Sequence, residues 1–440
     1  MAAVVSNTNT NPNVGVGVGA EAGAVAGPKS VKYSGSTETT AWFDFKGFST
    51  AFVNTIRRKL LSDVRGVAMV AEPVEDSSII IKENHSRLNN QFLSLRISLI
   101  PVHIPPPNYG GEMSVLDRYE IRIDKICDIP GGEINVTTDD IMIYDKSTGG
   151  FLEKSLVQKI FPRETLTSTG GLMIKNISNP IHILPLRGPR GEQPGESVKI
   201  RAGLKVGTGG VHPCFSQVSA VSYEIAEGVT AADTFGKTMN TEIRFMVESV
   251  GVQTPEIILI QAVDELIRHV VTIQTELGVI ERQGGGNSTM IETIVDGEEM
   301  LFMFKNEGYT LGMLLQDYIL QLVRERTPER FHEWFVGVRI PHPLTPQMVM
   351  RLSSRGITNI SEMIQKWMIP ALEMAKADAE YVGKQIMIQA KDFIQPHPLS
   401  FMLKSDYIPV IEKGMGGDES ESQSVGRKTQ GTDEGPILSR

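Results

Sequence analysis

The sequence predicts an α+β fold made of two small units, each an antiparallel sheet with helices against it. Two distant segments carry apolar residues at helical spacing, and short stretches typical of strands accompany each of them. A run of glycines lies between the two segments, which favours a linker there. The chain therefore carries two helix-plus-sheet units, and each has a striped helix that needs a partner surface.

The first striped helix is expected within residues 48–61. Its apolar side chains recur every four residues, at Phe52, Ile56, Leu60 and Val64. This spacing places them on one face of a helix. Residues 67–70 follow as a short apolar stretch typical of a strand, and a further helix is expected over residues 257–269.

The second striped helix is expected from residue 308 onwards. Its apolar residues follow the pattern i, i+3, i+4, i+7, i+8 and i+11, at Leu311, Leu314, Leu315, Tyr318, Ile319 and Leu322. The strands expected beside it are residues 300–304, 335–340 and 348–352. A long helix is expected over residues 360–389.

The clearest linker is the run Gln-Gly-Gly-Gly-Asn-Ser at residues 283–288. Three successive glycines followed by Asn and Ser favour an open coil over a helix or a strand. The low-complexity start up to Gly27 and the end from Gly414 cannot bury enough apolar surface to offset the entropy of ordering. We therefore expect both ends to be disordered.

Two parts of the sequence resemble the alpha-like subunits of multisubunit RNA polymerases. Residues 50–61 and 83–101 resemble bacterial alpha, the archaeal D protein and the third subunit of RNA polymerase II. Residues 306–312 and 337–344 resemble their smaller partner, the archaeal L protein or the eleventh subunit of RNA polymerase II. The resemblance implies that both partners are fused in one chain, as in polymerases of large DNA viruses.

The resemblance implies two alpha-like dimerisation units paired within one chain, with a mostly β domain inserted in the first. The abundance of Gly, Pro and β-forming residues in the middle of the chain agrees with such an insert. The expected domains are a tail (1–30), a first unit (31–104 and 238–283), an inserted domain (105–237), a linker (284–292), a second unit (293–400) and an extension with a disordered tail (401–440).

The resemblance also implies site residues. The dimer seam is expected to contain Phe52, Ile56, Leu60, Leu311, Leu314, Leu315, Tyr318 and Ile319. Arg57 and Arg58 match arginines that help the assembled pair dock onto the second-largest polymerase subunit, and a solvated basic face is the alternative. Arg96 lies among apolar residues, so a buried ion pair and a contact with another subunit both remain open.

The function that the resemblance implies is a non-catalytic assembly subunit of a DNA-directed RNA polymerase. Its expected partners are the two largest subunits and a small subunit of the same enzyme, and DNA is contacted only through the complex. The net charge of −9 agrees, because an acidic surface repels a phosphate backbone. No homo-oligomer is expected, since both striped helices are satisfied within one chain.

Cysteine and histidine usage argues against a metal or a cofactor. The chain has 2 cysteines, Cys127 and Cys214, and 8 histidines without HxxxH or HExxH spacing. We therefore expect no bound metal, no cofactor and a reducing intracellular compartment. Transcription in the host cytoplasm or nucleus, with or without packaging in a virion, is compatible with the sequence. No apolar run is long enough for a membrane-spanning helix, and the start lacks the basic region of a signal peptide.

Two other functions stay open as alternatives. Gly-rich segments at residues 131–132 and 207–210 admit a nucleotide-dependent enzyme, although neither has the P-loop pattern. The β-rich middle admits a viral structural protein of a capsid or core. Neither alternative explains two different striped helices in family order.

Overall fold

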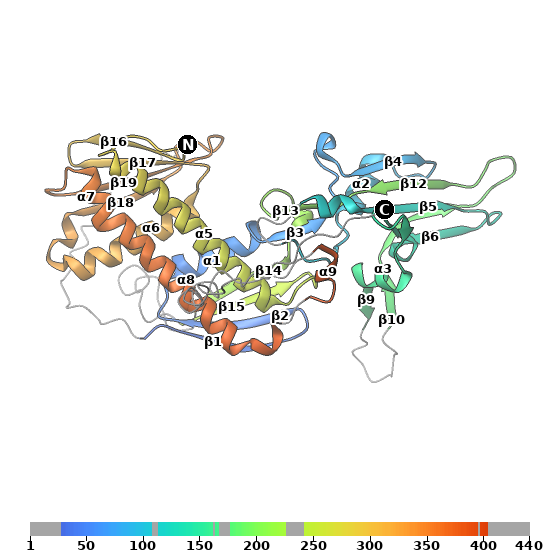
Figure 1. The fold of residues 1–440 in the computed structure, drawn as a ribbon, viewed down its shortest axis with the longest axis horizontal. Coiled ribbons are helices and arrows are strands. Elements are labelled where there is room, and N and C mark those ends of the chain that lie inside the picture. Colours follow the sequence, from blue (N-terminus) through green and yellow to red (C-terminus); the bar gives the residue numbers. More distant parts are fainter. Residues whose placement is uncertain are drawn as a thin grey trace, which may run out of the picture.

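The computed structural model describes residues 28–107, 113–161, 163–166, 177–225, 242–394 and 397–403. This part of the chain forms an elongated molecule, with a helix-rich body at one end and a β-rich body at the other (Figure 1). The predicted α+β class with antiparallel sheets is confirmed. The disordered ends expected at residues 1–27 and 414–440 lie outside the described residues.

The first sheet has the strand order β1-β2-β15-β14, and all its pairs are antiparallel. Its strands are β1 (Ser30–Ser36), β2 (Thr40–Lys46), β14 (Val218–Ile225) and β15 (Glu242–Ser249). Helix α1 (Thr50–Ser62) begins after Ser49, whose hydroxyl accepts the Phe52 N–H as an N-cap. Helix α5 (Pro255–Arg282) follows β15. We call these strands and helices the first unit.

The second sheet has the order β16-β17-β19-β18 and is also antiparallel. Its strands are β16 (Ile291–Asp296), β17 (Glu299–Lys305), β18 (Trp334–Arg339) and β19 (Gln347–Ser354). Its helices are α6 (Tyr309–Arg326), α7 (Ile360–Met363), a π-helical segment (Ile364–Met368) and α8 (Ile369–Gln389). We call this group the second unit.

The two units share one topology. In each, two strands precede a striped helix, two further strands follow it, and a long helix ends the unit. In each, the strands lie in the order first, second, fourth, third. The difference lies between the striped helix and the third strand, where the first unit holds the β-rich body and the second unit holds a single 3₁₀ helix, Pro328–Glu333.

The predicted helix over residues 360–389 is confirmed, with a local distortion. Its π-helical segment comes directly before the start of α8, where Pro370 stands in the first turn. Proline lacks an N–H and its ring crowds the carbonyl four residues earlier, so the helix widens there. The second striped helix, α6, approaches its sheet closely at Gly312. A Cβ on this residue would lie only 2.4 Å from Val338 Cγ1, so the close approach requires a glycine there.

Helix α5 is longer than the expected residues 257–269. The apolar stripe continues through Val270, Ile273, Leu277 and Ile280, all fully buried. Gly278 does not end the helix. The helix ends instead before Gly284, which adopts the left-handed backbone common after helix C-termini, with φ 71°. None of the helices in the described residues combines the length and apolar character that a membrane span requires.

The linker is more ordered than the expected open coil. Glu276 of α5 accepts hydrogen bonds from Thr289 Oγ1 (2.8 Å) and Met290 N (3.1 Å). Asn287 Oδ1 accepts the Thr293 N–H of the edge strand β16 at 3.2 Å. These bonds fix the chain against both neighbouring elements, and β16 begins at Ile291, inside the expected linker range.

The β-rich body contains a five-stranded sheet of order β4-β12-β5-β7-β8 and further strand pairs. The sheet consists of β4 (Ile79–Asn84), β5 (Tyr119–Ile126), β7 (Met142–Asp145), β8 (Gly150–Phe151) and β12 (Ser197–Ala202). The pairs are β3 (Arg65–Ala68) with β13 (Lys205–Thr208), β6 (Glu133–Thr137) with β11 (His182–Arg187), and β9 (Arg163–Leu166) with β10 (Ile177–Pro180).

Short helices complete the described part of the chain. They are α2 (Asn90–Ser98), α3 (Lys154–Ile160), α9 (Ser400–Leu403) and the 3₁₀ helices Val74–Asp76, Met113–Arg118, Thr138–Asp140, Pro213–Phe215 and Lys391–Phe393. Helix α9 follows the second unit in sequence, yet Leu399 and Met402 are buried in the core of the β-rich body. In Figure 1 this segment lies between the two bodies.

Three elements belong to another part of the molecule than the expected domain boundaries assign them to. Strand β4 and helix α2, expected in the first unit, belong to the β-rich body, because β4 pairs with β12 and Leu93 of α2 is buried in that core. Strand β14, expected in the insert, pairs with β15 in the first unit. Pairing with a strand far away in sequence decides both placements.

Candidate functional site

The two units meet along their helices. Helix α1 packs against α6, and α5 packs against α8, so that residues of both sheets and all four helices form one continuous apolar core. Figure 1 shows α5 and α8 running side by side through the helix-rich body. We call this contact between the two units the seam.

The structure buries every residue that the sequence assigned to the seam. Phe52, Ile56, Leu60, Leu311, Leu314, Leu315, Tyr318 and Ile319 are each at most 2% exposed and belong to the same core. The rings of Phe52 and Tyr318 contact each other edge to face. Burial of each large side chain contributes on the order of 1.5–3 kcal/mol, so the seam is a strong apolar contact.

Polar contacts border the apolar seam, and the sequence did not point to them. Gln389 of α8 donates to Val31 O at 2.7 Å and accepts the Tyr33 N–H at 2.8 Å. Its amide therefore satisfies the free edge of β1 as a neighbouring strand would. At the other end, Gln365 donates to Glu281 of α5 at 2.8 Å. No local pattern in a sequence signals pairs so far apart along the chain.

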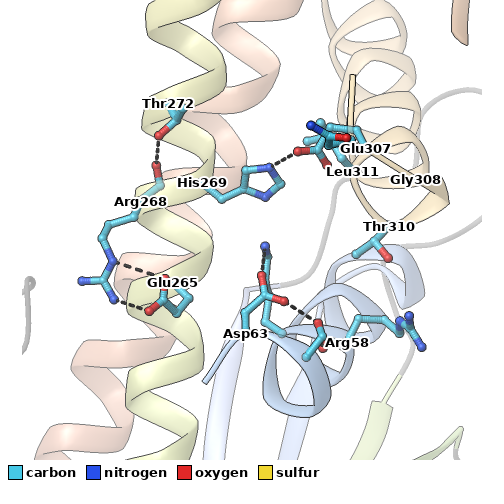
Figure 2. A pocket seen from close by; sticks show the side chains of 13 residues that line it. Arg58, Asp63, Glu265, Arg268, His269, Thr272, Glu307, Gly308, Thr310 and Leu311 are labelled. Atoms are coloured by element: carbon cyan, nitrogen blue, oxygen red, sulfur yellow. Dashed lines mark hydrogen bonds and ion pairs between the residues drawn. The ribbon is translucent and has the colours of Figure 1, made fainter. Parts of the chain in front are cut away.

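A polar pocket of about 530 Å³ opens at one end of the seam. Figure 2 shows that it lies between the end of α1, the middle of α5 and the start of α6. His269 Nε2 lies 2.7 Å from Glu307 Oε1, and Lys59 pairs with Asp63. The pocket is lined by both cationic and acidic side chains, so it has no marked preference for one sign of charge.

The two arginines of α1 point in different directions. Arg57 is partly buried and its Nε donates to Asn54 Oδ1 at 2.9 Å. Arg58 is exposed and lines the polar pocket beside Gly308 and Thr310. Arg58 therefore lies at the border of the seam, where a further protein can reach it, and the docking role of both arginines stays a prediction.

Arg96 lies in the β-rich body, away from the seam. It is exposed, and it donates through Nε to Ile183 O (3.0 Å) and through Nη2 to His182 O (3.2 Å). The buried ion pair that the sequence left open is therefore wrong, because the acceptors are main-chain carbonyls of β11. A contact with another subunit stays a prediction.

The cysteines and glycines of the described residues show no catalytic arrangement. Cys127 is buried, and burial raises the pKa of the Cys214 thiol to about 11, which disfavours the reactive thiolate. A Cβ at Gly209 would lie 2.4 Å from Leu61 O, so this glycine permits close packing against α1. Within the described residues, no three His, Cys, Asp or Glu side chains form a group that could hold a metal ion.

The sequence matches a known family. Residues 42–270 match the family described as RNA polymerase Rpb3/Rpb11 dimerisation domain. The matched region begins in β2 and ends in α5, so it contains most of the first unit and the β-rich body. It covers a little over half of the 440 residues.

Several curated proteins are similar to the chain. The human (Homo sapiens) DNA-directed RNA polymerases I and III subunit RPAC1 is 24% identical over 207 residues, which are 44% of this chain and 53% of that protein. The DNA-directed RNA polymerase subunit Rpo3 of Pyrococcus horikoshii is 27% identical over 101 residues, 23% of this chain and 36% of that protein. The chain spans about half the length, or less, of these relatives.

The family match agrees with the geometry on two points. The striped helix α1 and the part of α5 up to residue 270 lie within the matched region, and both helices pack in the seam. The β-rich body lies between them in the matched region, as it does in the fold. The protein therefore belongs to the RNA polymerase Rpb3/Rpb11 dimerisation domain family.

Proposed function

We propose that the protein is a non-catalytic assembly subunit of a DNA-directed RNA polymerase, in which two fused alpha-like units pair within one chain. The observation that carries this proposal is the single core formed by α1 and α5 of the first unit with α6 and α8 of the second. A dimerisation domain normally buries such helices against a second chain. Here the second unit occupies that place.

The shared topology supports the proposal that the second unit is also alpha-like. The family match ends at residue 270 and does not include the second unit. The second unit nevertheless repeats the strand order and helix positions of the first. A tether between two such units gives an effective concentration around the millimolar range, which makes their pairing independent of the amount of protein.

The paired units would form a platform for the two largest polymerase subunits and a small subunit of the same enzyme. Arg58 lines the pocket at the border of the seam, and it and Arg57 supply positive charge for docking the second-largest subunit. The net charge of −9 favours contact with DNA through the other subunits rather than directly. The linker of this arrangement follows α5 and ends before β16 begins at Ile291.

Purification of the tagged chain from its native source tests the proposal. We expect the two largest polymerase subunits to accompany it in equal ratio, and we expect the pure chain not to incorporate nucleotides. A purification that lacks those subunits, or nucleotide incorporation by the pure chain, would contradict the assignment.

We further propose a source among large DNA viruses, because the fused arrangement of the two units is the type found in their polymerases. The proposed location is intracellular, in the host cytoplasm or nucleus, or inside the virion. Mass spectrometry of infected-cell fractions and purified particles distinguishes these places. A chain absent from all infected fractions would contradict a viral source.

A further inference from the structure

A charged pair crosses the seam beside the apolar core. Lys29, directly before β1, places its Nζ 2.7 Å and 2.6 Å from the two carboxylate oxygens of Asp378 on α8. The Tyr318 hydroxyl of α6 donates to the same carboxylate at 2.6 Å. The side chain of Lys29 is 30% exposed and that of Asp378 is 12% exposed, so the pair is largely withdrawn from water.

The same helix holds the backbone of the first unit beside this pair. Tyr381, three residues after Asp378, donates its hydroxyl to Lys29 O at 3.1 Å. Gln389 satisfies the next part of β1, through its bonds to Val31 and Tyr33. One face of α8 therefore fixes the position of Lys29 relative to Asp378, and a shift of either unit along the seam separates the charges.

A second, half-buried carboxylate lies nearby on α6. Asp317 accepts a hydrogen bond from Ser49, the N-cap residue of α1, and another from Gln321 at 2.9 Å. Burial raises the pKa of Asp317, and Lys29 acts against this shift. The second unit thus brings two carboxylates to the seam, and the first unit brings the ammonium and hydroxyl groups that they need.

Neither unit can satisfy these groups with a second copy of itself. Two second units would bury the Asp378 carboxylate without Lys29, and two first units would leave the Lys29 ammonium without Asp378. A buried ion pair adds little net stability compared with an apolar pair. A buried charge that lacks its partner, however, is strongly destabilising. Charged groups of this kind therefore discriminate between a partner that neutralises them and a partner that does not.

We propose that Lys29, Asp378 and Tyr318 form a specificity determinant that selects the first unit as the partner of the second and rejects a second copy of the same unit. The inference rests on the proposed pairing of the units. It assigns to these residues the choice of partner, whereas the apolar stripes supply the attraction.

Charge reversal in two separate chains tests this proposal. One full chain carries Lys29→Asp, another carries Asp378→Lys, and both have a protease site inserted between Gly285 and Gly286. After cleavage, the two nicked proteins are mixed, unfolded and refolded together. Differently tagged halves then report, by affinity capture and native mass spectrometry, which first half is bound to which second half.

We expect the halves to exchange partners. The unchanged halves should pair with each other, and the two reversed halves should pair with each other, at least about tenfold over the original like-charged combinations. If the reversed chains fail to refold, Lys29→Met and Asp378→Asn give the same sorting with neutral groups. Random sorting of the charge-reversed halves and also of the neutral halves would overturn the proposal.

A matched control uses Lys32→Asp and Glu373→Lys, which make the same charge changes at exposed positions of β1 and α8. These halves should sort at random, and selective sorting of the control would overturn the proposal. Separation of the unchanged nicked halves would contradict the pairing itself. Halves that stay together but sort at random contradict this inference alone.

Discussion

Phe52 of α1 and Tyr318 of α6 face each other across the seam, with ring centroids 6.4 Å apart and ring planes inclined at 78°. Their contact joins the two striped helices directly. Because both rings are at most 2% exposed, neither can be removed without leaving a cavity between the units. The seam is therefore part of the folding core rather than a secondary contact.

Phe52→Ala should lower the free energy of unfolding by about 3–5 kcal/mol, the usual effect of removing a buried ring. Phe92→Ala is the matched control, since Phe92 is 52% exposed, and its effect should stay within about 1 kcal/mol. Urea unfolding of both variants gives the comparison. Equal effects would show that the seam contributes little to stability.

Replacing both Arg57 and Arg58 by Ala should leave folding nearly intact, because Arg58 is exposed and Arg57 is only partly buried, with a hydrogen bond to Asn54 of the same helix. Capture of the second-largest polymerase subunit should weaken, because electrostatic contacts steer docking. Arg190→Ala with Arg282→Ala is a control that removes the same charge at other positions away from α1. If the Arg57 and Arg58 variant melts far below the wild type, the pair is structural and docking is not its role.

The unfolding free energy should depend on pH through His103. Burial lowers the pKa of His103 from 6.5 to about 4, and nearby His397 contributes to the same shift. Below pH 6.5 the unfolded chain therefore takes up a proton that the folded chain does not. Stability should be full above this value and fall by about 1–3 kcal/mol as the pH decreases towards 4.

His103→Gln should remove this part of the pH dependence, because glutamine does not titrate. Urea unfolding of wild type and variant at about pH 7.5 and about pH 4.5 isolates the contribution of His103 from that of the carboxylates. An identical loss of stability in both proteins would show that His103 takes up its proton as easily in the folded chain.

The purified chain should carry no stoichiometric zinc or iron. Its 2 cysteines and unclustered histidines supply too few ligands for a tetrahedral site. Elemental analysis after treatment with a chelator measures this. One metal ion per chain that survives chelation would contradict this expectation.

The helices of the seam could be predicted because their signals are local. The stripe from Leu311 to Leu322 defines α6, and the one from Phe52 to Leu60 defines α1. The end of α5 was placed too early, although Ile273 and Ile280 continue its apolar stripe. Local periodicity therefore identifies a buried helix more reliably than it identifies its end.

The membership of sheets and the polar contacts could not be predicted, because they depend on distant partners. Nothing near Ile80 indicates that it pairs with Arg201, so β4 was assigned to the wrong body. Nothing near Lys29 indicates Asp378, so the charged pair was missed. Both require the fold before they can be recognised.

Charged substitutions in the apolar seam should separate the units. Leu315→Asp or Ile56→Asp would place an unpaired carboxylate among fully buried side chains, at a cost of several kcal/mol. These variants show how the halves behave after cleavage of the linker when the seam itself is broken. Nicked halves that carry either substitution should not remain together.

Size-exclusion chromatography after cleavage between Gly284 and Asn287 tests the intramolecular pairing most directly. The seam, rather than the linker, should hold the units together, because its apolar core contains all four helices. The account predicts that the unsubstituted halves elute together at the position of the intact chain. Elution of these halves as two separate species would contradict it, and the hypothesis of two paired units in one chain would be abandoned.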